Sequence, residues 1–356
     1  MQHHEVDTDR LTASGPDGLT AGEVLAGYLH SHAGDFLRGL RLYGESGADT
    51  AAADSAALTL RGAARRIGGG LHTFRPLLDP GWADQLRTEL GWLSGTLAQE
   101  HACTARLHRL VGALARLSGA APVPVAVPAS ALGSVPGARA GADPGGPPGT
   151  LTVGASRAGA LLERQLTLAR TRAHSAALQA LGSSRFHAVA DAVAVLASEV
   201  PLAPLASAPA VEVLAGPGEA TERQLLDAVA ALPLARAAHP YNAEALVHGL
   251  ATSSEGETQD APWHQVRQLL RLHRYAQEVW CPGGAPDPVL LGAGQALDRH
   301  RDAAEAAAAA ANAARTPRIA PTTAYALGVL HADQRHEVEA ARFAFQQVWQ
   351  QAAVAR

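Results

Sequence analysis

A stripe of basic side chains in the last third of the chain is the sequence feature with the clearest chemistry. His264, Arg267, Arg271 and Arg274 follow one another at steps of three, four and three residues, which places them on one face of an α-helix. Like charges on one stripe repel one another unless solvent or an anion neutralises them. An extended polyanion would do so, because each guanidinium can hold two phosphate oxygens. The spacing therefore predicts an anion-binding helix face, with an ordinary solvated helix face as the alternative interpretation.

The same pattern occurs a second time, in the first third of the chain. The window LTLRGAARRIGGGLHTFRP, which starts at Leu58, aligns without gaps with HQVRQLLRLHRYAQEVWCP, which starts at His264. Such an internal repeat is typical of a fold built from two copies of one unit. The aligned pairs include Arg61 with Arg267, Arg65 with Arg271, Phe74 with Trp280 and Pro76 with Pro282.

The first copy carries fewer basic groups at the repeated positions. Leu58 and Gly68 stand where the second copy has His264 and Arg274, although Arg66 and His72 lie nearby. We therefore expect the second copy to contribute more to the binding of an anion. We also expect binding to strengthen modestly as His264 becomes cationic at lower pH.

The elements that must position these residues are predicted to be helices throughout. Hydrophobic residues make up 47% of the chain, but aromatic residues only 4% and methionine a single residue, so the core must consist of Leu, Val and Ala. Leu and Ala favour helix, and no window alternates as a half-buried strand would. The periodicity predicts helices in the stretches 21–43, 54–74, 80–118, 161–181, 186–197, 219–232, 261–281, 291–315 and 322–352.

Composition also divides the chain into regions. Residues 1–19 are predicted to form a polar tail, and residues 20–118 a first helical half. Residues 119–150 are dense in Pro, Gly, Ala and Ser, which predicts an exposed linker or long loop. Residues 151–356 hold the remaining helices and the second half, with a Pro-rich break at 201–217.

Several classes of protein are disfavoured by the sequence. Two cysteines, no apolar leader and no long uncharged apolar run favour a soluble cytoplasmic protein over a secreted or membrane one. A net charge of −4 argues against a general nucleic-acid or membrane binder, so an anion site must be local. The chain contains no HExxH, paired CxxC or GK[ST] motif, and we expect no metal, no cofactor and no catalysis.

The order of these segments resembles the CHAD family, the conserved histidine α-helical domain, over roughly residues 20–352. The resemblance rests on WHQVRQLLRLHRYAQEV, on the window from Leu58 to the following helix, on GSSRFHAVADAV at 182–193 and on ALGVLHADQRHEVEAARFAFQQVW near the end. It implies an all-α fold of two antiparallel four-helix-type bundles related by pseudo-two-fold symmetry. It also implies a basic groove between them that binds inorganic polyphosphate. The family often accompanies a CYTH domain, of which this sequence has no trace.

The leading hypothesis is therefore non-enzymatic binding of polyphosphate, in a protein that could associate with polyphosphate granules. The family pattern is incomplete, since Leu58, Gly68, Leu272 and His273 replace expected residues. The alternative is a divergent scaffold that has lost the anion site and acts through a protein partner or a second copy of itself. The expected binding residues are Arg61, Arg65, Arg66, His264, Arg267, Arg271 and Arg274, with His72 and His300 at the periphery.

Overall fold

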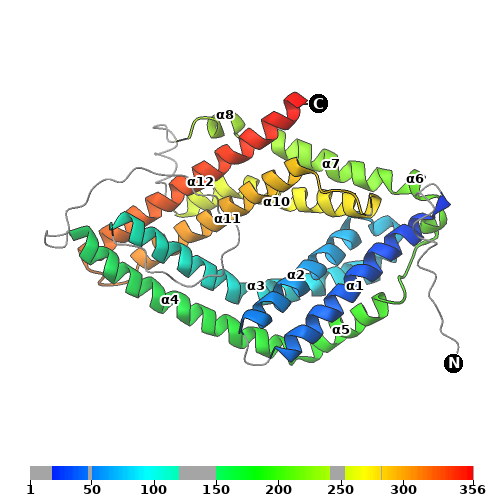
Figure 1. Ribbon diagram of the computed structural model, residues 1–356, viewed down its shortest axis with the longest axis horizontal. Coiled ribbons are helices and arrows are strands. Elements are labelled where there is room, and N and C mark those ends of the chain that lie inside the picture. The colour runs from blue at the N-terminus through cyan, green and yellow to red at the C-terminus, as the bar shows by residue number, and fades with distance from the viewer. Residues whose placement is uncertain (1–17, 47–49, 120–149, 241–252, 282, 356) are drawn as a thin grey trace.

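The computed structural model describes residues 18–46, 50–119, 150–240, 253–281 and 283–355, and this part of the chain is all-α, as the sequence predicts (Figure 1). Its only extended pairings are two isolated bridges, Thr20 with Pro209 and Leu78 with Leu202. The longer helices are α1 (Ala21–Glu45), α2 (Thr50–Thr73), α3 (Pro80–Leu117), α4 (Thr150–Leu181), α5 (Ser184–Leu196), α7 (Ala215–Ala230), α10 (Ser253–Trp280), α11 (Pro288–Ala314) and α12 (Pro321–Ala355). The shorter ones are η3 (Arg75–Leu77), η4 (Pro204–Ser207), α6 (Ala210–Val213) and α8 (Leu234–Ala237).

Most helix boundaries agree with the sequence pattern, but α4 begins about three turns before the predicted start at 161. Its first turns carry only small buried side chains, Ala155 and Ala158, which give little hydrophobic periodicity. Helix α10 likewise begins before the predicted start at 261 and continues through Pro262. The predicted polar tail and linker lie almost wholly outside the described residues.

Each copy of the repeat is followed by a long helix with the same kind of start. Asp79 precedes Pro80 at the start of α3, and its carboxylate accepts a hydrogen bond from the Trp82 amide at 2.7 Å. Asp287 precedes Pro288 at the start of α11, and accepts one from the Val289 amide at 2.7 Å. A carboxylate cap followed by proline fixes the first turn of a helix. In both copies, the chain reverses direction at this point, so that α3 packs against α2 and α11 packs against α10.

The first buried cluster joins α1, α2, the first part of α3 and α5. Its largest side chains include Phe36 of α1, Ile67 of α2 and Leu90 of α3, all almost fully buried. Ala276 and Val279 of α10 pack against the same cluster. Helix α10 is therefore held next to α2, the helix that carries the first arginine pair.

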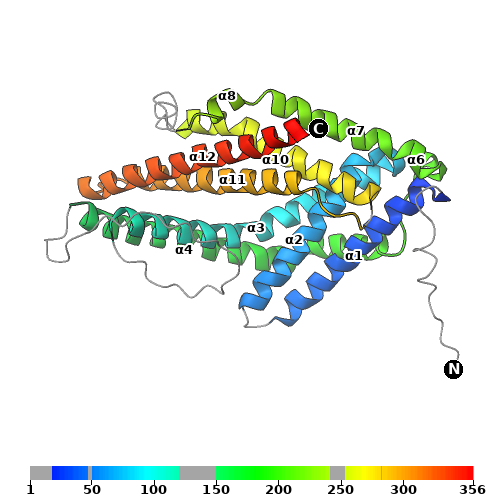
Figure 2. The ribbon, with the colours of Figure 1, turned by 45° about the horizontal axis from the view of Figure 1, so that its top comes forward.

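A second cluster joins α7, α8, α10, the start of α11 and the end of α12 around Trp263 and Phe345. A third contains residues from the C-terminal ends of α3 and α11 and from the N-terminal parts of α4 and α12, four helices that run side by side in Figure 2. Leu110 of α3 and Leu327 of α12 are both fully buried in it. The two sequence halves thus share a core, because α3 and α11 each run from their own cluster into the common one.

Candidate anion-binding site

A cavity of about 450 Å³ lies where α2, α3, α10 and α11 meet. No carboxylate stands among the described residues that line it, whereas guanidinium groups come from all four helices. Gly68, Gly91 and Gly95 leave space around its walls. The cationic lining consists of Arg61 and Arg65 of α2, Arg87 of α3, Arg267 and Arg271 of α10 and Arg301 of α11, with His72 of α2 beside them.

The two predicted stripes supply the centre of this cavity. Arg61 and Arg65 are one helical turn apart on α2, and Arg267 and Arg271 are one turn apart on α10, so each pair points to one side of its helix. The two helices approach closely, because a Cβ atom at Gly69 would lie only 2.6 Å from the Tyr275 ring. This close packing brings both arginine pairs to the same cavity.

Three of the six arginines form no hydrogen bond or ion pair with a described carboxylate, namely Arg61, Arg65 and Arg271. Burial, the neighbouring Arg267 and, to a smaller extent, Arg65 lower the pKa of Arg271 to about 10. Burial and the charges of Arg65 and Arg301 also lower the pKa of Arg61. The buried Nε atom of Arg61 has no hydrogen-bond partner in the described part of the chain, so the centre of the cavity holds positive charge in excess.

The remaining arginines are anchored by carboxylates outside the cavity lining. Arg267 Nε donates to Asp298 at 2.5 Å, and Arg87 lies 3.6 Å from Asp84. Arg301 Nη2 donates to Asp302 at 2.6 Å. These partners orient the guanidinium groups while leaving the other donor atoms of each fork for a ligand.

The structure separates Arg66 from the cavity. Its guanidinium donates to Glu278 of α10 at 2.8 Å and lies over the Tyr275 ring at 5.5 Å from the ring centroid. Adjacent helical residues point about 100° apart, so Arg66 faces α10 whereas Arg65 faces the cavity. This side chain joins two helices through an ion pair and does not add to the unpaired charge.

The two ends of the α10 stripe also lie outside the cavity lining. The ring of His264 contacts that of His300 at a centroid distance of 5.4 Å, and burial lowers the His264 pKa below its ordinary value. The Arg274 guanidinium lies beside Gly294 of α11. The stripe follows the boundary between α10 and α11, and only its two middle residues reach the cavity.

His300 belongs to a buried polar network that fastens α10 to α12. Arg335 donates to Asp260 at 2.7 and 3.3 Å, and Arg342 donates to the same carboxylate at 2.6 Å and to Glu339 at 2.7 Å. His300 is 1% exposed, and burial lowers its pKa to about 4. Neutral His300 can therefore accept the hydrogen bond from Arg342 Nε at 3.3 Å. The role of His300 is structural, because its contacts with Asp260 and Arg342 help to hold α10, the helix that carries Arg267 and Arg271, against α12.

Arg87 and Arg301 are the cavity residues that the sequence analysis missed. When the two copies are aligned from their Asp-Pro starts, Arg87 corresponds to Gln295 and Arg301 to Leu93, so the repeat gives no signal for either. One signal was available in the sequence. The helix that follows each stripe must pack back against it, so the arginines of α3 and α11 were also candidates. Their inclusion makes the cavity a product of four helices and not of two stripes.

Other kinds of site receive no support from the described residues. They contain no group of three or more His, Cys, Asp and Glu side chains arranged to hold a metal ion. None of the described helices combines the length and the apolar character that spanning a membrane requires.

Comparison with known proteins agrees with the resemblance seen in the sequence. The model of the CHAD domain matches residues 36–311. Among solved structures, PptA from Streptomyces chartreusis is 58% identical, covers 93% of this chain and 100% of its own, and superposes with a TM-score of 0.75. A search of curated proteins found no match. Since the family model spans most of the described helices and both arginine pairs of the cavity, the chain belongs to the CHAD family.

Proposed function

We propose that this protein binds inorganic polyphosphate, without catalysis, in the cavity between α2, α3, α10 and α11. The observation that carries the proposal is the lining itself, in which six arginines face one space and no described lining residue is acidic. Each guanidinium presents planar donors that match phosphate oxygens. Membership of the CHAD family supports the same ligand.

The charge state of the empty cavity explains why an anion would bind there. Arg61, Arg65 and Arg271 repel one another in a partly buried space, as the lowered pKa values of Arg61 and Arg271 indicate. A polyanion relieves this repulsion and also forms charge-assisted hydrogen bonds. The net charge of −4 does not oppose this, because the potential at a cavity is set mainly by the charges nearest to it.

The test is a calorimetric titration with long-chain polyphosphate at two salt concentrations. Affinity should fall steeply with salt, because each neutralised phosphate releases counterions. Variants of two neighbouring arginines distinguish binding in the cavity from binding to basic side chains outside it. Arg65→Gln should weaken binding about tenfold by removing a charge-assisted contact, whereas Arg66→Gln should change it little, since Arg66 is occupied by Glu278.

A second pair of variants compares the two repeats. The sequence pattern predicts that replacing Arg267 and Arg271 by Ala weakens binding more than replacing Arg61 and Arg65. Because two arginines of each copy reach the cavity, the structure instead predicts losses of similar size. Arg271→Gln should leave the unliganded protein at least as stable as wild type, because it removes an unpaired, partly buried charge. Absence of polyphosphate binding by the wild type at low salt would exclude the proposed function and leave the scaffold hypothesis in its place.

A further inference from the structure

A second cavity, of about 370 Å³, adjoins the first and shares Arg61, Ala98 and Arg301 with it. It extends between α3 and α11 and adds Arg106 and Arg109 of α3 to the wall. The volume of this second cavity is similar to that of the first, so a phosphate chain that fills both cavities is about twice as long as one that fills the first. A role for the second cavity rests on the proposed function, because it concerns the path of the same anion.

One face of α3 lines both cavities in succession. The residues that it contributes follow at helical steps from Arg87 through Gly91, Ser94 and Ala98 to Ala102, and then to Arg109. At 1.5 Å per residue the distance from Arg87 to Arg109 along α3 is about 33 Å. The two cavities therefore lie in line along a single helix, as an extended chain of phosphates requires.

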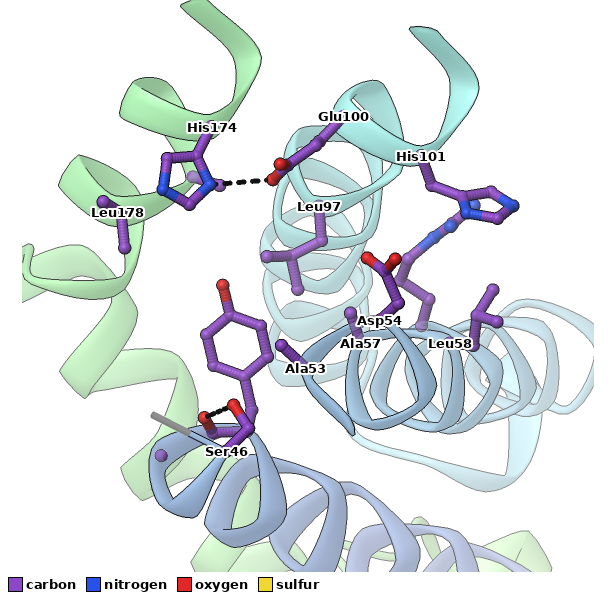
Figure 3. Close-up of a pocket in the computed structure, with 14 residues that line it drawn as sticks. Ser46, Ala53, Asp54, Ala57, Leu58, Leu97, Glu100, His101, His174 and Leu178 are labelled. Carbon is purple, nitrogen blue, oxygen red and sulfur yellow. Dashed lines mark hydrogen bonds and ion pairs between the residues drawn. The ribbon is translucent and has the colours of Figure 1, made fainter. Parts of the chain in front are cut away.

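Charge distinguishes this second cavity from another neighbour of the first. The cavity in Figure 3 also touches Arg61, but Asp54 and the Glu100–His174 pair line it too, and Arg61 is the only arginine among its described lining residues. Burial, followed by the charges of Glu100 and Asp54, raises the pKa of Tyr43 there. That space repels a polyanion. Among the described residues that line the second cavity, four are arginines and two are carboxylates, Asp302 and Glu305.

Glu305 pairs with two of the guanidinium groups of the second cavity. Its carboxylate accepts a hydrogen bond from Arg106 Nη2 at 2.6 Å and lies 3.7 Å from Arg301 Nε. The buried Nε of Arg106 has no hydrogen-bond partner among the described residues. A phosphate chain that extends past Arg301 meets the same two guanidinium groups that Glu305 now holds. The Glu305 side chain is 40% exposed, so its carboxylate can rotate into solvent when displaced.

We propose that the second cavity is a subsite that selects for chain length, and that Glu305 competes with the anion for Arg106 and Arg301. A short anion fills the first cavity and leaves Glu305 in place. A long chain displaces Glu305 and gains the contacts of Arg106 and Arg109.

The experiment compares triphosphate with long-chain polyphosphate by calorimetry at one low salt concentration. Arg106→Ala should lower the affinity for the long chain about tenfold and leave that for triphosphate unchanged, because only the long chain reaches Arg106. Glu305→Gln should raise the affinity for the long chain several-fold, since the competitor has lost its charge. It should affect triphosphate less, because triphosphate reaches Arg301 but not Arg106. Glu89→Gln is the matched control, because it breaks a comparable ion pair with Arg185 that lies outside both cavities.

The outcomes separate this inference from the proposed function. Wild type and Glu89→Gln should both bind the two anions. If Arg106→Ala and Glu305→Gln then show the same affinity for the long chain as wild type, the subsite is excluded and only binding in the first cavity remains. Weaker long-chain binding by Glu305→Gln would exclude the competition. If the wild type binds neither anion, the proposed function fails and the subsite fails with it. Circular dichroism of each variant verifies that the helices are intact.

Discussion

At the scale of single residues, the cavity is maintained at a cost. Arginines that face one another in a partly buried space destabilise the fold, because burial and mutual repulsion both disfavour the cation. The lowered pKa of Arg271, about 10, records this cost. The ion pair with Asp298 offsets this cost in part for Arg267, whereas Arg65 forms no ion pair with a described carboxylate. A bound anion is the partner that would remove the penalty from the whole group at once.

His72 provides a measurable pH dependence at the same scale. It lines the cavity, and burial together with Arg87 lowers its pKa below the ordinary 6.5, against the opposing charge of Asp84. A bound polyanion favours the imidazolium and raises this pKa, so binding takes up a proton. Affinity for polyphosphate should therefore rise as the pH falls through the bound-state pKa towards the lower free-state pKa.

Calorimetric titrations from neutral to mildly acidic pH check this expectation. His72→Gln should flatten the profile, and His264→Gln should retain it, since His264 packs against His300 outside the cavity lining. The sequence analysis attributed the pH effect to His264 instead. A profile that survives in His72→Gln but not in His264→Gln would support that original interpretation.

At the scale of elements, the sequence predicted which helices line the cavity better than which residues reach it. The three-four-three spacing correctly placed Arg267 and Arg271 on one face, and the repeat found Arg61 and Arg65. Arg66 could have been set aside from geometry alone, because it is one residue from Arg65 and points elsewhere. Its partner Glu278, by contrast, could not be foreseen, since that ion pair depends on how α2 crosses α10.

The crossing of α2 and α10 can be tested with two adjacent glycines. A methyl group at Gly69 would lie 2.6 Å from Tyr275, whereas one at Gly68 meets nothing within 4 Å. Gly69→Ala should destabilise the protein by about 1–2 kcal/mol through overpacking. Gly68→Ala should stabilise it by up to about 1 kcal/mol through helix propensity. Urea denaturation measures both, and similar effects at the two positions would contradict the close packing.

At the scale of the whole molecule, the long helices prevent the two halves from being independent. Helix α3 belongs to the first cluster and to the shared one, and α11 to the second cluster and the shared one. The sequence did not reveal this interlocking. Alanine fills much of the shared core, as at Ala306 and Ala310, and a run of alanines does not indicate which face is buried. Close packing of small side chains decides the arrangement instead.

We therefore expect one cooperative unfolding transition. Trp82 and Trp92 pack against the first cluster, and Trp263 and Trp349 belong to the second, so tryptophan fluorescence and calorimetry sample both ends. The calorimetric and van't Hoff enthalpies should agree. Leu327→Ala, in the shared cluster, should cost about 2–5 kcal/mol and shift the whole transition to lower temperature. Two separate transitions, of which only one responds to Leu327→Ala, would contradict the shared core.

The cavity described above is built with guanidinium groups in a chain that contains no lysine at all. Lysine acetylation removes a positive charge, and it has no side chain here through which to lower the charge of the cavity. The charge of the cavity still responds to competing anions, to ionic strength and to protonation of His72. In the laboratory the same property is an advantage, because amine-directed labels have no side-chain amine in the cavity to attack.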